Sequence, residues 1–241
     1  MNVYNQAFPG VTVITATNRP QYMERLLVNY LQQDYPVKQL IIVLNNAPFN
    51  LEEWQRKIWQ YQDIEVIHLQ GNPSLGLCFN TAISRAKYDL VAKFDDDDYY
   101  FPQYLINSTR HFLNTNADIV GKACRYIFFA DLSTLALYSL GVENEFVTYV
   151  AGATMIVKKN LFDKIAFPDI TSGDDSEFQR KCIREGFNIF SGDRHYYITI
   201  RQSSIQNHTF QFHDQEYLNF CQTVANIPTY LEEWIAKGQG F

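Results

Sequence analysis

The chain of 241 residues is 46% hydrophobic, which is enough apolar material for the core of one large α/β domain. Its formal net charge of −6 argues against a binder of nucleic acid or of anionic membranes, because phosphate contacts need a basic surface. The four cysteines are widely spaced without a C-x-x-C pair, and no secretory signal precedes Val11. Neither a zinc knuckle nor a disulfide framework is therefore expected, and the expected location is cytoplasmic, with peripheral membrane association as a second possibility.

The N-terminal part of the chain alternates strand and helix patterns. The predicted strands are Val11–Thr15, Leu40–Leu44 and Ile64–Leu69, and the predicted helices are about Gln21–Gln33, Leu51–Tyr61 and Leu75–Ala86. Such alternation with short connections predicts a parallel, doubly wound sheet with right-handed crossovers. Pro20 suits the first turn of a helix, so the TNRP segment is predicted to be a strand-to-helix loop whose N–H groups face a ligand. No G-x-G-x-x-G motif follows Val11, which argues against a dinucleotide-binding dehydrogenase.

The pattern changes after Pro102. The prediction is a helix to about Leu113, a strand near Ile119, an aromatic hairpin over Arg125–Leu140, a strand over Tyr149–Val157, a helix ended by Gly186 and a helical tail from about Phe212. The tail is assigned from the i, i+3, i+4, i+7 spacing of Tyr217, Phe220, Cys221 and Val224. The longest apolar stretch, Tyr126–Val142, is interrupted by polar residues, so we expect two strands around a turn and no transmembrane segment.

The most informative feature is a run of four aspartates, Asp95–Asp98, directly after the buried-strand pattern Leu90–Phe94. Such clustered charge repels itself unless a cation compensates it. Hard oxygen ligands suit Mg²⁺ or Mn²⁺, and a metal at a strand end usually also holds the phosphates of a substrate. In open α/β sheets, ligands bind beyond the carboxyl ends of the strands. The alternative is a solvated acidic turn, since aspartate favours turns.

Several segments together resemble a known family. They are VTVITATNRP, LQQDYP, NPSLGLCFNTAISRA, FDDDDYYFP, AGATMIV and SGDDSEFQRKC, which run in this order from Val11 towards His208. Their order and spacing resemble family 2 of the nucleotide-diphospho-sugar glycosyltransferases, which have the GT-A fold. The resemblance implies an α/β fold with a Rossmann-like, doubly wound, mostly parallel sheet and a smaller mixed sheet on the acceptor side. It implies one domain over residues 1–241, with a nucleotide-binding half to about 100, an acceptor-side half over about 101–211 and a helical tail over about 212–241.

The resemblance implies donor-side roles for residues at matching positions. Thr15, Thr17 and Arg19 would line the nucleoside pocket, and Asn45 and Asn46 stand where the family usually has an acidic residue that reads the base. Ser74, Gly76 and Asn80 match the loop and helix start that close over the nucleotide. Asp95 and Asp96 would lie near the ribose and diphosphate, with Asp97 on the metal. An amide accepts a hydrogen bond from a pyrimidine N3–H as a carboxylate does, yet it also donates. From the residues alone, Thr15 could equally cap a helix, and Asn80 could be a surface amide.

The resemblance also implies roles on the acceptor side. Asp175 matches the second member of the family's Glu-Asp pair, with Asp174 in place of the glutamate, and would be the base that deprotonates the acceptor. The alternative is that both aspartates only cap a helix and complement its dipole. On the donor side, His208 matches a histidine that reaches the metal in some GT-A enzymes, although a lone histidine is more often a surface or core residue than a ligand. Arg201 could neutralise the diphosphate or pair with a surface acid.

The expected function is therefore a metal-dependent inverting glycosyltransferase that uses Mn²⁺ or Mg²⁺. A UDP-sugar is the favoured donor, a sugar or lipid-linked glycan is the expected acceptor, and bacterial surface-polysaccharide assembly is the setting that the resemblance implies. One alternative is a nucleotidyltransferase, although TATNRP has no glycine and a single arginine for a triphosphate. Another is a catalytically inactive sugar- or nucleotide-binding module. The sequence does not indicate an oligomeric state.

Overall fold

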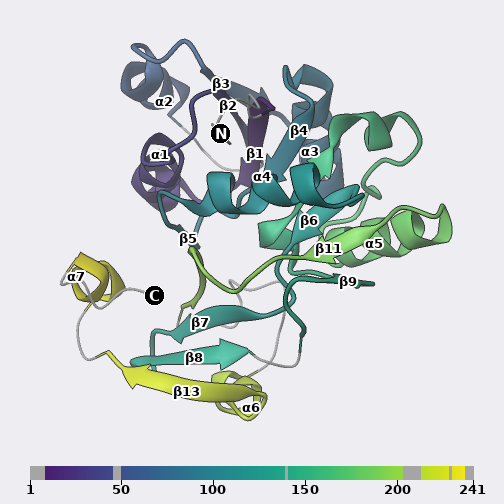
Figure 1. Ribbon diagram of the computed structural model, residues 1–241. Coiled ribbons are helices and arrows are strands. Elements are labelled where there is room, and N and C mark those ends of the chain that lie inside the picture. Colours follow the sequence, from purple (N-terminus) through teal and green to yellow (C-terminus); the bar gives the residue numbers. More distant parts are fainter. Residues whose placement is uncertain (1–8, 46–49, 139–140, 203–212, 228–229, 237–241) are drawn as a thin grey trace, which may run out of the picture.

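The structure is a computed structural model that describes residues 9–45, 50–138, 141–202, 213–227 and 230–236 (Figure 1). Within these ranges, an 8-stranded main sheet has the order β3-β2-β1-β4-β10-β6-β11-β9. Its strands are β1 (Val11–Thr17), β2 (Lys38–Asn45), β3 (Ile64–Leu69), β4 (Leu90–Lys93), β6 (Ile119–Gly121), β9 (Glu145–Val147), β10 (Ile156–Lys158) and β11 (Ile189–Ser191). The first four strands pair in parallel, and β10 runs antiparallel to β4 and β6.

A second, 5-stranded sheet lies beside the main sheet and has the order β13-β8-β7-β12-β5 (Figure 1). Its strands are β5 (Tyr99–Tyr100), β7 (Arg125–Phe129), β8 (Thr134–Tyr138), β12 (Tyr197–Arg201) and β13 (Cys221–Asn226). The predicted aromatic hairpin is confirmed as β7 and β8, which pair antiparallel, whereas β12 joins β7 in parallel. The fold class is thus α/β, with a mostly parallel main sheet and a smaller mixed sheet, as the sequence predicts.

The helices are α1 (Met23–Leu31), α2 (Leu51–Ile58), α3 (Leu75–Arg85), α4 (Tyr104–Asn114), α5 (Asp174–Arg184), α6 (Asp214–Leu218) and α7 (Leu231–Ala236). Local sequence explains several of their ends. Asn50 and Ser74 cap α2 and α3, because their side-chain oxygens accept hydrogen bonds from main-chain N–H groups of the first turn. Gly186 follows α5 with φ of 83°, a left-handed conformation that favours glycine and ends the helix where the sequence predicts.

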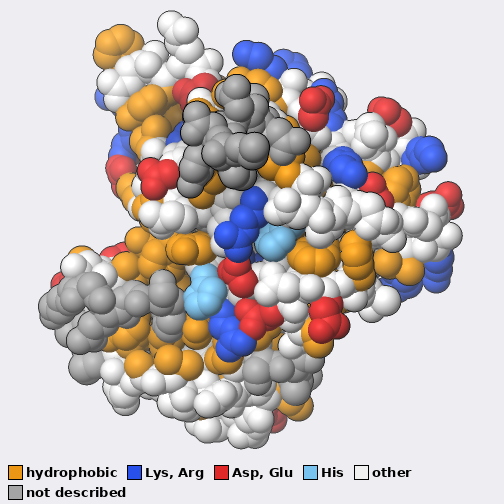
Figure 2. Space-filling model, in the orientation of Figure 1, with side chains coloured by type: hydrophobic (Ala, Val, Ile, Leu, Met, Phe, Trp, Pro, Cys, Tyr) orange, Lys and Arg blue, Asp and Glu red, His pale blue; other side chains and the backbone are white. Residues whose placement is uncertain are grey.

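Helices cover both faces of the main sheet, so the sheet is doubly wound. Val13 in β1 belongs to a core cluster that includes side chains of α1, α2 and α4. Its neighbour Ile14 points to the opposite face and belongs to a cluster with side chains of α3 and α5. On the face drawn in Figure 2, acidic and basic side chains of the described residues occur together between the two sheets instead of forming one basic patch. No helix in the described part of the chain has the length and apolar character to cross a membrane.

Two predicted elements are only partly correct. The segment Tyr149–Val157 is predicted as one strand, but a 3-10 turn, η2 (Gly152–Thr154), occupies its middle, and β10 begins only at Ile156. The tail is predicted to be helical, and α6 and α7 are helices, but the residues Cys221–Asn226 between them form β13, which pairs antiparallel with β8. Residues Cys221–Asn226 form a strand because they pair with the edge of β8, and such tertiary hydrogen bonds override a weak helical spacing.

Candidate functional site

The site lies at the carboxyl ends of β1 and β4, which are parallel neighbours in the middle of the main sheet. The loop after β1 contributes Thr17 and Arg19, and the aspartate run Asp95–Asp98 follows β4. Pro20 begins the short 3-10 helix η1 (Pro20–Tyr22) at its first position, as predicted. Because adjacent parallel strands end at one edge of the sheet, residues about eighty positions apart come into contact here.

Arg19 is the main partner of the aspartate run. Its Nη1 atom lies 2.8 Å from Asp97 Oδ2, and its Nη2 and Nε atoms bond the two oxygens of Asp96. The Thr17 hydroxyl also donates to Asp96. Burial raises the pKa of Asp96 to about 6 and the charge of Asp97 adds to this, while Arg19 and Thr17 oppose the shift. One guanidinium therefore offsets much of the repulsion between two of the four carboxylates.

Asp98 has a structural role that differs from that of its neighbours. Its carboxylate is buried and accepts hydrogen bonds from the Tyr197 hydroxyl and, at 2.9 Å, from the Ile200 main-chain N–H. Both partners belong to β12 of the smaller sheet. Burial raises the pKa of Asp98 well above its usual range. Asp98 thus joins the end of β4 to the second sheet.

Lys93, the last residue of β4, is a charged residue of the site that the sequence analysis misses. Its side chain is 9% exposed, and Nζ lies 2.6 Å from Asp95 Oδ1. Burial alone would lower the pKa of Lys93, but the charges of Asp95, Asp175 and Asp174 raise it above its usual value. One lysine thus interacts with the aspartate run on one side and with an acidic pair from α5 on the other. The signal in the sequence is a lysine inside an otherwise apolar strand, VAKF.

The acidic pair, Asp174 and Asp175, begins α5. Gln179 fixes this helix against the segment before η2, because its side chain bonds both the N–H and the C=O of Val150 at 2.8 and 3.0 Å. The Asp175 carboxylate rests on Gly152, where an added Cβ would overlap it. Gly173 occupies the N-cap position, so neither aspartate is the cap, although both lie in the first turn.

Asp174 is the more buried member of the acidic pair. It is 4% exposed, and its Oδ2 atom has no hydrogen-bond partner among the described residues. Burial raises the pKa of Asp174 to about 6; the positive charge of Lys93 opposes this, and the negative charge of Asp175 adds to it. Asp175 is only half-buried, so it is the more accessible member of the pair.

The remaining predicted donor-side residues fall into three groups. Thr15 and Asn45 are buried, and the hydroxyl of Thr15 and Oδ1 of Asn45 have no partner among the described residues. Thr15 lies inside β1, so it does not cap a helix. Arg201 is buried and forms an ion pair with Asp214 at 2.7 Å. Asn46 and His208 lie outside the described residues.

Ser74, Gly76 and Asn80 all contact the segment 167–170. Ser74 donates to Asp169, and a Cβ at Gly76 would overlap the Pro168 carbonyl. The Asn80 amide bonds the N–H and the C=O of Phe167 at 3.0 and 2.9 Å. These three residues hold the start of α3 against a segment that leads to α5, so they also fix the position of the acidic pair.

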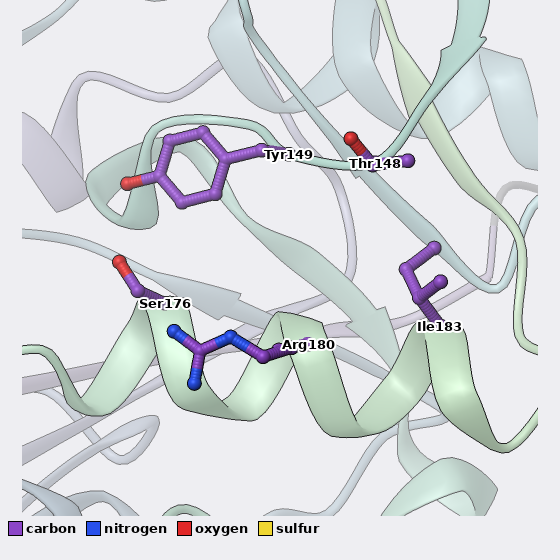
Figure 3. Close-up of a pocket in the computed structure, with 5 residues that line it drawn as sticks. All are labelled: Thr148, Tyr149, Ser176, Arg180 and Ile183. Carbon is purple, nitrogen blue, oxygen red and sulfur yellow. The ribbon is translucent and has the colours of Figure 1, made fainter.

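A surface pocket of about 250 Å³ lies beside the acidic pair (Figure 3). It is lined by Thr148, Tyr149, Ser176, Arg180 and Ile183. The first two come from the segment between β9 and η2, and the others lie on α5. The site therefore has carboxylates at the strand ends on one side, an acidic pair on the other, Lys93 between them and a pocket next to Asp175.

A Rossmann-like sheet with carboxylates at its central strand ends and a second acidic pair opposite them is an arrangement suited to group transfer from a nucleotide. Residues 12–153, more than half of the chain, match the family model for Glycosyl transferase family 2. The chain belongs to this glycosyltransferase family.

Relatives and solved structures agree with this assignment. The chain is 25% identical over 119 residues to an O-antigen biosynthesis glycosyltransferase, WbnJ, of Escherichia coli, a match that covers 48% of this chain and 47% of the relative. It thus spans about half the length of the curated relative it matches. The structure of S. aureus TarS 1-349 in complex with UDP-GlcNAc has a TM-score of 0.66 at 19% identity, covering 88% of this chain and 64% of TarS 1-349.

A second solved structure has the same fold. The mannosyltransferase PcManGT from Pyrobaculum calidifontis, in complex with GDP-Man and Mn²⁺, has a TM-score of 0.64 at 17% identity. The similarity covers 83% of this chain and 58% of PcManGT. At these identities the two structures support the fold.

Proposed function

We propose that this protein transfers a sugar from a nucleotide-diphosphate donor to an acceptor hydroxyl, with inversion at the anomeric carbon and with a divalent cation. The observation that carries the proposal is the position of Lys93, which bonds Asp95 of the aspartate run at 2.6 Å and on which the charges of the acidic pair also act. The proposed donor-side and acceptor-side carboxylates therefore act on one buried lysine, yet they lie in different environments. This separation of roles is what a transfer reaction between two substrates needs.

The donor would bind at the ends of β1, β2 and β4. Thr17 and Arg19 would lie along the nucleotide, and Asn45 at the end of β2 would contact the base. The buried Oδ1 of Asn45, which lacks a partner among the described residues, suits acceptance of a hydrogen bond from a pyrimidine N3–H. A UDP-sugar is for this reason the favoured donor. Related folds bind UDP-GlcNAc in TarS and GDP-Man in PcManGT.

The carboxylate oxygens of the aspartate run fit a divalent cation whose remaining ligands come from a diphosphate. Asp95 and Asp97 each use one oxygen for Lys93 or Arg19, which leaves Asp95 Oδ2 and Asp97 Oδ1 without a bond from any described residue. The described residues contain no cluster of three acidic, histidine or cysteine side chains placed to hold a metal. Mg²⁺ and Mn²⁺ sites of this kind need only one or two carboxylates, because phosphate oxygens and water supply the rest. When bound, the cation would neutralise charge that builds up on the departing diphosphate.

The acceptor side would supply the base. As the acceptor oxygen forms its bond to the anomeric carbon, the bond from that carbon to the diphosphate oxygen breaks and its electron pair leaves with the diphosphate. Asp175 would take the proton of the acceptor hydroxyl, because it is half-buried, next to a pocket and held in place by Gly152. Lys93 would fix the positions of Asp95 and the acidic pair by its charge.

The proposed acceptor is a sugar or a lipid-linked glycan, and the proposed setting is surface-polysaccharide assembly. The support for this setting is the relationship to WbnJ, whose name places it in O-antigen biosynthesis. Thermal unfolding with UDP, GDP, CDP and dTDP, each with Mn²⁺ or with EDTA, tests the donor and the cation together. One diphosphate should stabilise the protein in Mn²⁺ and not in EDTA. No stabilisation by any of the four, in either condition, would contradict the proposal.

A further inference from the structure

The pocket beside Asp175, which we call the α5 pocket, is lined by Thr148, Tyr149, Ser176, Arg180 and Ile183 (Figure 3). Two of these side chains are large, apolar and accessible, since Tyr149 is 48% and Ile183 is 36% exposed. Figure 3 shows the Tyr149 ring beside the first turns of α5, with its hydroxyl on the same side as the Ser176 hydroxyl. The pocket therefore combines an accessible aromatic ring with hydroxyl groups.

The α5 pocket starts at the proposed base. Ser176 directly follows Asp175 in the first turns of α5, and Ile183 lies about 12 Å along the helix from Asp175 at 1.5 Å per residue. Burial raises the pKa of the Tyr149 hydroxyl and the nearby charge of Asp175 adds to this shift, while the Ser176 hydroxyl opposes it. A molecule bound in the pocket would thus have one end within reach of Asp175.

These side chains match the surface of a sugar ring. One face of a pyranose carries C–H groups, which pack against the electron-rich face of an aromatic ring such as Tyr149. Its edge carries hydroxyls, which need partners that both donate and accept, and the hydroxyls of Thr148 and Ser176 do both. Ile183 supplies further apolar surface at the other end of the pocket.

The charges around the pocket favour a neutral sugar. Among its described lining residues the only basic one is Arg180, which is paired with Glu177 one turn earlier on the same helix. Asp175 acts on Tyr149 with negative charge, and Lys93 and Arg125 act on it with positive charge. Lys93 is already bonded to Asp95 and Arg125 to Tyr217, so a sugar carboxylate would meet the acidic pair while the basic groups nearby already have partners.

We propose that the α5 pocket binds a neutral sugar ring of the acceptor and that Tyr149 is the residue on which this ring packs. The inference rests on the proposed glycosyl transfer and adds that the acceptor sugar is neutral. It assigns to Tyr149 a part in acceptor selection, separate from the proton transfer to Asp175.

The test measures two reactions of one donor in the same solution with Mn²⁺. The donors are the glucose, galactose and N-acetylglucosamine derivatives of the nucleotide diphosphate that stabilises the protein, which we expect to be UDP. Hydrolysis and transfer to added methyl glycosides are followed by product analysis. The acceptors are the methyl glycosides of glucose, galactose and N-acetylglucosamine, with methyl glucuronide as the acidic comparison. Wild-type protein should transfer to at least one neutral glycoside in preference to the glucuronide.

Variants of Tyr149 locate the binding site. Tyr149→Ala should lower the ratio of transfer to hydrolysis about tenfold and raise KM for the glycoside, the loss expected for one aromatic contact. Tyr149→Phe keeps the ring and should remain near wild type. Trp59→Ala is the matched control, because Trp59 is an 81% exposed ring at the end of α2, near the other edge of the main sheet, and its removal should change neither reaction.

The outcomes separate the two proposals. The inference is wrong if Tyr149→Ala keeps the wild-type ratio, if the glucuronide is preferred, or if the donor is hydrolysed while no neutral glycoside is glycosylated. Wild-type protein that is stabilised by none of the four nucleotide diphosphates and hydrolyses none of the donors would instead contradict the proposed function, and the inference would fall with it.

Discussion

The carboxylate of Asp175 rests directly on the α-carbon of Gly152, so that a methyl group at position 152 would occupy the place of Asp175 Oδ2. Gly152 begins the turn η2, and Gln179 fixes α5 to the residues just before it. The position of the proposed base is therefore set by a residue that has no side chain of its own.

Gly152→Ala should displace Asp175 and reduce transfer at least as much as a small misplacement of a catalytic group does, by about 10²-fold. Nucleotide binding should stay near wild type, because the strand ends are unaffected. Turnover and nucleotide-induced thermal stabilisation measure the two effects. Gly10→Ala is the control, since it overlaps the Tyr88 ring at the amino end of β1, away from the site. Equal turnover in both variants would show that Asp175 tolerates displacement.

Asp175→Asn should retain nucleotide-sugar binding and lose transfer. The amide keeps the shape and one hydrogen-bond acceptor but cannot take a proton, and loss of a general base costs about 10²- to 10⁴-fold in rate. Direct binding and turnover should therefore separate. Turnover close to wild type would place the base elsewhere, and Asp174→Asn would then be the next variant to measure.

Lys93→Met should destabilise the protein by about 1–3 kcal/mol, because it leaves Asp95 and the acidic pair without their shared positive charge. Urea unfolding measures this change in the free energy of unfolding. Adding Asp174→Asn removes one of the repelling carboxylates and should recover part of the loss. Additive effects of the two substitutions would mean that Lys93 and Asp174 do not interact.

Asp174 should make stability depend on pH. Its pKa is raised from 3.8 to about 6 in the folded protein, so the folded state holds a proton there that the unfolded chain has lost. The contribution of Asp174 is then present below about pH 4 and is lost as the pH rises through about 6. Asp174→Asn should be more stable than wild type at pH 7, by roughly 2 kcal/mol, and no more stable at pH 4. The same difference at both pH values would contradict this assignment.

Asp97→Ala should abolish metal-dependent nucleotide binding and leave the fold intact. The substitution removes one proposed ligand, and it also removes a charge that repels Asp96, so the stability of the nucleotide-free protein should hold or rise slightly. Thermal unfolding with the stabilising nucleotide, in Mn²⁺ and in EDTA, gives both readings. A variant that still responds to Mn²⁺ as wild type does would exclude Asp97 as a ligand.

The sequence predicts the parts of this site that depend on local pattern. The aspartate run follows a short apolar strand, and Pro20 marks the loop after β1. Both loops that form the site at the strand ends can therefore be recognised in the sequence. The role of Lys93 cannot be predicted from local pattern, because it depends on α5, which begins about eighty residues later. Likewise, Asp98 looks like a turn residue until β12 brings Tyr197 and Ile200 against it. Pairing partners distant in sequence also explain why β13 has the spacing of a helix and the structure of a strand.

The hydrogen bonds between Asp98 and β12 matter for the design of chimeras between members of this family. The last residue of the aspartate run connects the two sheets, whereas the first three are bonded to Lys93, Arg19 and Thr17 at the ends of β1 and β4. A chimera that takes its smaller sheet from another family member should therefore be cut so that Asp98, Tyr197 and Ile200 come from the same parent. Replacing all four aspartates at once would remove this connection, and the resulting loss of activity would carry no information about chemistry.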